Sequence, residues 1–278
     1  MKNRYIPVLW AILFFICFSC CINRTNESLK PIAILGAFAD EIKMLEDSLK
    51  NRKMITIEGI KFSRGTLKGK QVVVAFTGIG KVNAAMTSAI LIDHFKPAKI
   101  IFTGIAGGLN PELNPTDILI AEKCVQHDLN YIYPDSLVSY SVSSPISGKV
   151  NPIFFRSDSG MLQILKERLA DIKLNVYERK GLVDTPKVVT GIIATGDAFV
   201  ASGTKKQELI KRFGADAVEM EGAAVAQVAY EQGIPFIIIR SISDSADENA
   251  GLDIKKFLNT AAQNANIVVI QLVENMQN

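Results

Sequence analysis

The sequence predicts a single α/β domain, built on a twisted, mostly parallel or mixed sheet with helices on both faces. Short runs of valine, isoleucine and alanine recur along the chain, which is typical of strands buried on both faces. Segments with apolar residues at helical spacing separate these runs, and this alternation indicates a sheet with crossover helices. No other region has a core composition of its own, so one domain is expected.

The expected strands are short apolar runs, and several of them end in Thr-Gly or in an acidic residue. They are residues 32–35, 72–76, 100–102, 188–194, 217–220 and 236–239. Helical patterns follow at 40–49, from Ala84 to Pro97, and at 222–231, where Gly233 and Pro235 are a stop signal. A last helix is expected with Asp253 as its N-cap. Residues 128–158, rich in Tyr, Ser, Pro and Asn, are predicted to form a long loop.

The first thirty residues have the pattern of an export signal. Lys2 and Arg4 precede an apolar run, residues 8–18, whose length is typical of a signal-peptide core. Ser19-Cys20-Cys21 then resembles the lipobox of bacterial lipoproteins, with Cys20 as the favoured lipidation site and Cys21 as the alternative. We therefore expect a signal peptide at 1–20, with an uncleaved anchor as the alternative, a polar tether at 21–30 and the domain at 31–278. We expect an exported protein that contacts the membrane only through this segment.

Composition excludes several classes of protein. Of 278 residues, 48% are apolar and 21% are charged, which excludes a disordered chain. The net charge of +3 is too small to indicate a nucleic-acid partner. Cys124 is the only cysteine after residue 21, and the two histidines, His94 and His127, offer no ligand cluster. We expect no metal and no organic cofactor, and a structural role for His127.

Acidic residues gather where the predicted strands end. Glu41 follows the first strand, Glu219 and Glu221 flank Met220, and Asp244 follows Arg240 beyond the last strand. Ligands of open α/β sheets bind outside the carboxyl ends of the strands. Each acid alone is explained by a helix cap or an ion pair. Together they suit a neutral ligand rich in hydroxyl groups, because carboxylates accept hydrogen bonds from sugars and one acid can protonate a ring nitrogen.

Six short motifs at these positions resemble a known family. They are Ile-Ala-Ile-Leu-Gly-Ala at 32–37 with Glu41, Thr-Gly-Ile-Gly-Lys at 77–81, Thr-Gly-x-Ala-Gly-Gly at 103–108, Gly-Asp-Ala-Phe at 196–199, Val-Glu-Met-Glu at 218–221 and Arg-Ser-Ile-Ser-Asp at 240–244. In this order, over about residues 31 to 275, they are similar to 5′-methylthioadenosine/S-adenosylhomocysteine nucleosidases of the purine nucleoside phosphorylase and uridine phosphorylase superfamily. The resemblance implies hydrolysis of the N-glycosidic bond of a 5′-thio-substituted adenosine, giving adenine and a thioribose, by a homodimer.

The resemblance also implies roles for individual residues. Asp244 matches the general acid at adenine N7, and Glu41 matches the acid that activates the attacking water. The implied substrate-binding residues are Glu221 at the ribose hydroxyls, Met220 against the sugar, Phe199 stacking on adenine, the Val200 backbone at the base edge, Ser243 and Arg240 as positioning groups, Ile79 and Gly107 in the wall near the sugar, and Glu219. An oxocarbenium-like transition state favours such a carboxylate-rich site.

Two other functions stay open. A purine nucleoside phosphorylase must hold phosphate beside the ribose, which requires arginine, whereas the turn at 36–41 offers Glu41 instead. The second alternative is an exported ligand-binding or adhesive lipoprotein with the same fold.

Ile105 and Ile254 stand where relatives often have serine and phenylalanine, and the 128–158 loop, implied to lie near the 5′ group, is long. The choice between methylthioadenosine and adenosylhomocysteine is therefore left open.

Overall fold

The computed structural model describes residues 30–179 and 182–277. The predicted signal peptide, both candidate lipidation cysteines and nearly all of the tether lie outside these residues. Within the described ranges, no helix combines the length and the hydrophobicity that crossing a membrane requires.

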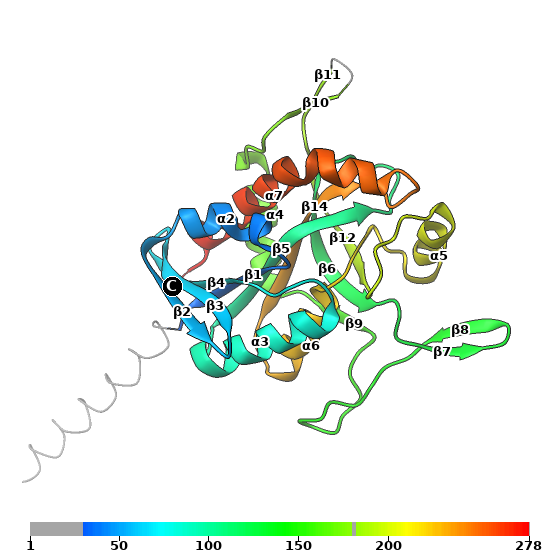
Figure 1. The fold of residues 1–278 in the computed structure, drawn as a ribbon, viewed down its shortest axis with the longest axis horizontal. Helices are drawn as coiled ribbons and strands as arrows, with labels where there is room; N and C mark the ends of the chain where they lie inside the picture. Colours follow the sequence, from blue (N-terminus) through cyan, green and yellow to red (C-terminus); the bar gives the residue numbers. More distant parts are fainter. Residues whose placement is uncertain (1–29, 180–181, 278) are drawn as a thin grey trace, which may run out of the picture.

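A mixed sheet forms the centre of the domain (Figure 1). Its strand order is β13-β12-β6-β14-β5-β1-β4-β3-β2, and β9 pairs with β6. The strands are β1 Ile32–Gly36, β2 Lys50–Ile57, β3 Ile60–Leu67, β4 Lys70–Phe76, β5 Lys99–Gly108, β6 Ile118–Gln126, β9 Phe154–Arg156, β12 Val188–Thr195, β13 Ala217–Glu219 and β14 Phe236–Asp244. Two hairpins lie apart from the sheet: β7 Asn130–Tyr133 with β8 Ser136–Ser139, and β10 Tyr177–Arg179 with β11 Leu182–Asp184.

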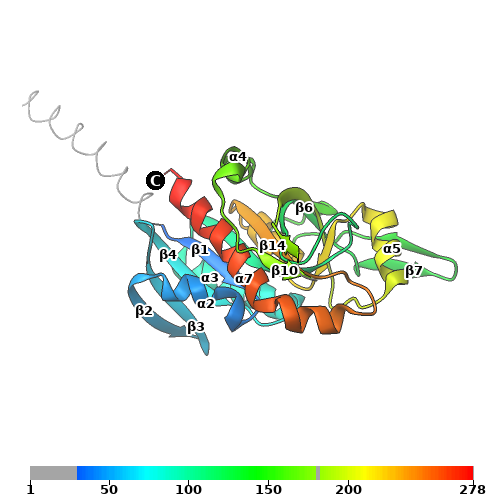
Figure 2. The same ribbon diagram turned by 90° about the horizontal axis from the view of Figure 1, so that it is seen from above.

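Helices cover the two faces of the sheet. The helices are α2 Ala39–Asp47, α3 Lys81–Phe95, α4 Ser159–Arg168, α5 Gly203–Phe213, α6 Gly222–Glu231 and α7 Ala250–Asn275, with a short 3-10 turn at Leu169–Asp171. Figures 1 and 2 show α2 and α7 on one face, and Figure 1 shows α3 and α6 on the other. Successive residues of the central strands point to opposite faces. In β1, Ala33 and Leu35 therefore pack toward α3 and α6, while Ile32 and Ile34 pack toward α2, α4 and α7.

Several predictions from the sequence are confirmed. The domain is α/β, and all six predicted runs are strands that start within two residues of the predicted positions, at 32–35, 72–76, 100–102, 188–194, 217–220 and 236–239. Helix α6 has the predicted bounds, and α2 ends two residues earlier than predicted. These elements were predictable because their apolar pattern is continuous and their ends carry local stop signals.

Four details of the prediction are wrong. The strand predicted at 100–102 does not end there, because β5 continues to Gly108 through its pairing with β14 and β13. Strand β14 runs on to Asp244 rather than ending at 239. Helix α7 begins at Ala250 after the N-cap Asn249, so Asp253 lies in its first turn. Residues 128–158 contain the β7–β8 hairpin and β9, which pairs with β6.

The pairing of β13 with two neighbours closes one side of the sheet on itself. Strand β13 lies parallel to β12 and antiparallel to β5, where Val218 pairs with Gly107. Strands β5, β14, β6, β12 and β13 therefore form a closed ring of pairings. This closure brings the ends of β5, β13 and β14 together, and the candidate site lies there.

Candidate active site

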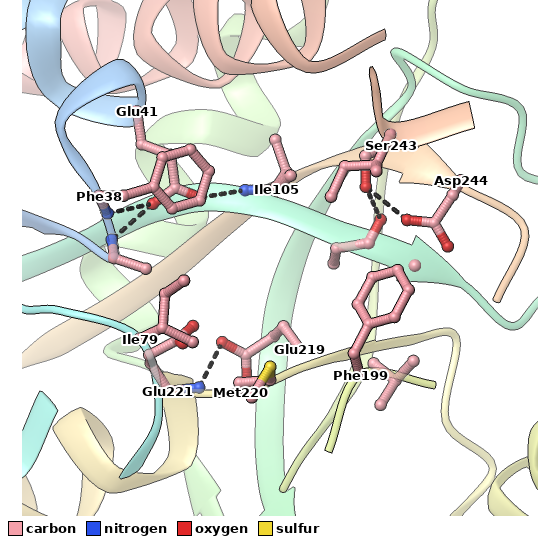
Figure 3. Close-up of a pocket in the computed structure, with 15 residues that line it drawn as sticks. Phe38, Glu41, Ile79, Ile105, Phe199, Glu219, Met220, Glu221, Ser243 and Asp244 are labelled. Atoms are coloured by element: carbon pink, nitrogen blue, oxygen red, sulfur yellow. Dashed lines mark hydrogen bonds between the residues drawn. The ribbon is translucent and has the colours of Figure 1, made fainter. Parts of the chain in front are cut away.

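One pocket lies where the chain leaves β1, β13 and β14 and where β5 bends past them (Figure 3). Its cavity volume is about 130 Å³. Its lining combines three buried glutamates and one buried aspartate with apolar side chains. The lining residues are Ala37, Phe38, Glu41, Ile79, Ile105, Ala106, Gly107, Phe199, Val218, Glu219, Met220, Glu221, Ser243, Asp244 and Ile254. The predicted acids are thus brought together around one cavity.

Glu41 projects into the pocket from the first turn of α2. Its side chain is 2% exposed, and its Oε1 accepts a hydrogen bond from the Ile105 amide at 2.9 Å. Oε2 accepts from the amides of Ala37 and Phe38, so the turn after β1 holds the carboxylate in one orientation. Burial raises the pKa of Glu41 even though Arg240 and these amides lower it. Glu41 is thus a held carboxyl group that accepts a proton more readily than an exposed one.

Arg240 is the counter-charge of the site. Its side chain is fully buried in β14, stacks over the Phe102 ring at 4.2 Å and donates from Nη2 to Glu219. Glu219 also accepts from the Gly222 amide at 2.7 Å and from the Thr195 hydroxyl. Arg240 thus offsets the mutual repulsion of the neighbouring acids Glu219 and Glu221.

Glu221 lies beside this pair but is held less closely. Its Oε2 is 3.8 Å from Arg240 Nη2, and its Oε1 accepts from the Gly80 amide at 2.8 Å. Burial, followed by the negative charge of Glu219, raises the pKa of Glu221 to about 8. A carboxyl group with this pKa exchanges a proton near neutral pH and makes hydrogen bonds to hydroxyl groups in either state.

Asp244 lies at the opposite end of the pocket from Glu41, beside the Phe199 ring (Figure 3). It is 2% exposed; its Oδ2 accepts from the Ser243 hydroxyl at 2.6 Å and its Oδ1 from the Ala246 amide at 2.8 Å. A Cβ atom at Gly107 would lie 2.9 Å from Oδ1, so glycine lets β5 pass close to this carboxyl group. Burial raises the pKa of Asp244, as an acid that donates a proton requires.

Gly104 provides the space in which Glu41 and Arg240 meet. A Cβ atom there would lie 2.4 Å from both Glu41 Oε1 and Arg240 Nη1. Nη1 and Nε of Arg240 are buried and have no hydrogen-bond partner among the described residues. Glycine at this position therefore lets the Glu41 carboxylate and the Arg240 guanidinium approach each other closely.

The other predicted residues are divided between the pocket and its surroundings. Ile79, Met220 and Phe199 line the cavity, and Ile79 and Phe199 are more than half exposed. Ser243 contacts Asp244, as expected. Val200 does not line the pocket, because its side chain is buried in a separate apolar cluster with Leu209 and Phe213. The Val200 backbone at the base edge stays a prediction.

Ile105 and Ile254, the two positions singled out in the sequence, both line the pocket. Residues 128–158 contribute nothing to its lining. The proximity of this segment to the 5′ group of the substrate stays a prediction. The β7–β8 hairpin instead projects away from the body of the domain (Figures 1 and 2).

Sequence reasoning missed residues that support the site without having unusual chemistry. Phe38 lines the pocket next to Glu41, and the amides of Gly80 and Gly222 hold Glu221 and Glu219. Thr195 contributes its hydroxyl group. The Thr-Gly pair at the end of a predicted strand marked Thr195, but no local signal identifies an amide that donates across the fold. Within the described part of the chain, no group of three or more His, Cys, Asp or Glu side chains could hold a metal ion.

Comparison with known proteins gives consistent results. A model of the Phosphorylase superfamily matches residues 31–274. The 5′-methylthioadenosine/S-adenosylhomocysteine nucleosidase of Geobacillus kaustophilus is 36% identical over 88% of this chain and 97% of its own length.

Two solved structures are similar over the same part of the chain. One is the nucleosidase of Neisseria meningitidis in complex with methylthio-immucillin-A, with a TM-score of 0.76 and 35% identity over 89% of this chain and all of that one. The other is the futalosine hydrolase of Helicobacter pylori, with a TM-score of 0.77 and 33% identity over 89% of this chain and 99% of that one. The resemblance in the motifs thus extends over the whole domain, and the chain belongs to the phosphorylase superfamily and, within it, to the family of 5′-methylthioadenosine/S-adenosylhomocysteine nucleosidases.

Proposed function

We propose that the protein hydrolyses the N-glycosidic bond of 5′-methylthioadenosine, S-adenosylhomocysteine or both, giving adenine and the thioribose product. The observation that carries this proposal is the placement of two buried carboxyl groups, Asp244 and Glu41, at opposite ends of one pocket. An acid at the base and an acceptor at the water are what cleavage by water requires. The enzyme is therefore an N-glycosyl hydrolase.

In the mechanism, Asp244 donates its proton to adenine N7 while Phe199 stacks on the ring, so that the base leaves neutral. Burial keeps Asp244 protonated to a higher pH than an exposed aspartate. Positive charge then develops on the ribose, where Glu219 and Glu221 lower its energy. Glu221 accepts from the ribose hydroxyls, with Met220 against the sugar.

Glu41 takes the proton of the attacking water, and the amides of Ala37, Phe38 and Ile105 hold its carboxylate in place for this step. The same arrangement favours water over phosphate as the nucleophile. Arg240 is surrounded by Glu41, Glu219 and Glu221, and its guanidinium is already paired with Glu219. A phosphate dianion therefore finds no unpaired cation there, whereas a water molecule needs none.

The assay that tests the function measures adenine release by the purified full chain, with and without phosphate. We expect release from methylthioadenosine without phosphate. Release only when phosphate is added would identify a phosphorylase, and no release under either condition would favour the ligand-binding alternative. Adenosylhomocysteine and futalosine are assayed in parallel, because Ile105 and Ile254 shape the wall that limits the 5′ group.

We also propose a homodimer. Phe76, Ile79, Val82 and Met86 form an exposed apolar strip from the end of β4 along α3, next to the pocket. The β7–β8 hairpin exposes Tyr131, Ile132 and Val138, and such apolar surface favours a partner. Sedimentation should give the mass of a dimer, and Val82→Glu together with Met86→Glu should give a monomer.

Export with lipidation at Cys20, or at Cys21, remains a proposal from the sequence. Its support is the apolar run followed by Ser19 and the paired cysteines. Cys20→Ser and Cys21→Ser variants test it by membrane partitioning and by the mass of the mature chain. Loss of lipid in one variant would identify the site, and unchanged behaviour in both would indicate a plain signal or anchor.

A further inference from the structure

The loop that carries Phe199 is held by two residues outside the pocket. This Phe199 loop, residues 196–200, follows β12 and contacts His127 and Asp128 at the end of β6. Asp128 Oδ2 accepts a hydrogen bond from the Asp197 amide at 2.9 Å. The His127 ring packs against Gly196, where a Cβ atom would lie 2.3 Å from Nε2.

The other oxygen of Asp128 binds a different element. Its Oδ1 is 2.6 Å from Lys81 Nζ, at the first residue of α3. Lys81 in turn donates its amide to Asp197 Oδ1 at 2.7 Å, so Asp128, Lys81 and Asp197 form a closed set of contacts. One residue earlier, the Gly80 amide donates to Glu221 at 2.8 Å. The start of α3 thus holds both the Phe199 loop and the carboxylate nearest the ribose.

The charge of Asp128 persists over the working pH range. Burial alone would raise its pKa, but the hydrogen bonds from Lys81 and from the Asp197 amide lower it below the usual value. Lys81 and Asp128 are 18% and 30% exposed in their side chains, so solvent screens this pair only in part. His127 is the other titratable neighbour, and burial lowers its pKa, which keeps the imidazole neutral.

We propose that Asp128 is a positioning residue for the reaction: it fixes the Phe199 loop relative to Glu221, and so sets where the base lies with respect to the sugar. This inference rests on the proposed function. The Phe199 side chain is 52% exposed, so its position depends on the backbone that carries it. An error of about 1 Å in such a group is enough to slow a reaction strongly.

The test compares Asp128→Ala and Asp128→Asn with Glu122→Gln in the full chain. Glu122 is the control, because it lies on β6, two residues beyond whose end Asp128 stands, and forms a more exposed ion pair with Lys166 at 3.2 Å, away from the pocket. We expect Asp128→Ala to raise KM and the inhibition constant of adenine about tenfold, with a smaller change in kcat. For Asp128→Asn, KM and the inhibition constant should lie between those of Asp128→Ala and those of the unaltered chain. The asparagine oxygen still accepts a hydrogen bond from the Asp197 amide, but the side chain has no negative charge for Lys81.

A second readout does not depend on catalysis. Amide hydrogen exchange of residues 196–200 should become faster in Asp128→Ala than in Glu122→Gln, while exchange in the central strands stays unchanged. If the unaltered chain releases no adenine, the proposed function fails, and the exchange rates still test the attachment of the loop. Unchanged exchange together with unchanged KM in Asp128→Ala overturns the inference. A fall in the apparent kcat that matches the unfolded fraction, with KM unchanged, would overturn it too. If Asp128→Ala does not fold, Asp128→Asn and Lys81→Met are measured in its place.

Discussion

The guanidinium of Arg240 donates to the carboxylate of Glu219, with both side chains almost completely excluded from solvent. Two charges in such a place stabilise the fold only as long as both are present. Glu221 Oε2 lies 3.8 Å from the same nitrogen, so Arg240 is the counter-charge of both acids. The fold and the chemistry of the pocket therefore depend on one buried cation.

Replacing Arg240 should destabilise the protein strongly. Arg240→Met leaves Glu219 buried without its counter-charge, and the free energy of unfolding should fall by about 3–5 kcal/mol. Adding Glu219→Gln removes that uncompensated charge and should recover a substantial part of the loss. Chemical denaturation of both variants checks this. A double variant no more stable than Arg240→Met would contradict the pairing as the cause.

Asp244→Asn should remove the proton donor while leaving the hydrogen bonds of the site largely intact. We expect kcat for methylthioadenosine to fall by about 10²–10⁴ with little change in thermal stability. A 4-nitrophenyl riboside that carries the methylthio group at its 5 position releases 4-nitrophenolate, which needs no proton. The variant and the unaltered chain should cleave it at similar rates. An equal loss on both substrates would contradict the acid role.

Glu221 should make stability depend on pH. Its pKa is raised from 4.5 to about 8 in the folded protein, so the folded state binds a proton that the unfolded state has already released. Stability from this group is complete below about pH 4.5 and is lost as the pH rises through about 8. The free energy of unfolding should fall by about 2–4 kcal/mol between these values, and Glu221→Gln should flatten the decline. Chemical denaturation at a series of pH values measures how the free energy of unfolding depends on pH. Glu122→Gln removes an exposed carboxylate and, as the control, should leave the decline unchanged.

Gly104→Ala should disrupt the meeting of Glu41 and Arg240. The added methyl group would lie 2.4 Å from an atom of each, so one side chain must move. We expect kcat to fall about 100-fold or more. Gly251→Ala is the control: nothing lies within 4 Å of its Cβ position in α7, and it should raise stability by about 0.5–1 kcal/mol. Equal activity in both variants would contradict the role of Gly104.

The central elements could be predicted from the sequence because the apolar residues that they bury are consecutive in the chain. The runs around Ile34 and Val74 are apolar on both faces, and Pro235 ends the turn after α6. The strand β2 was missed for the opposite reason. It is the edge strand and begins Lys50-Asn-Arg-Lys, so most of its side chains are exposed and its alternation is lost.

The acids of the site could be predicted because each follows an apolar run. Their supports could not, since the partners are backbone amides brought in by distant pairings, as with Ile105 at Glu41 and Gly80 at Glu221. The extension of β5 to Gly108 depends in the same way on its neighbours β14 and β13, which no local pattern in residues 103–108 records.

The closure of β13 onto β5 has a consequence for the order of events during folding. Ala217 pairs with Gly108 across a long stretch of intervening chain, and contacts between such distant residues form only after the cost of closing the loop has been met. Glu219 stands at the end of that closing strand, and Arg240 comes still later in the chain. A chain synthesised only as far as β13 therefore lacks Arg240 and Asp244, and the appearance of nucleoside binding reports that both β13 and β14 have joined the sheet.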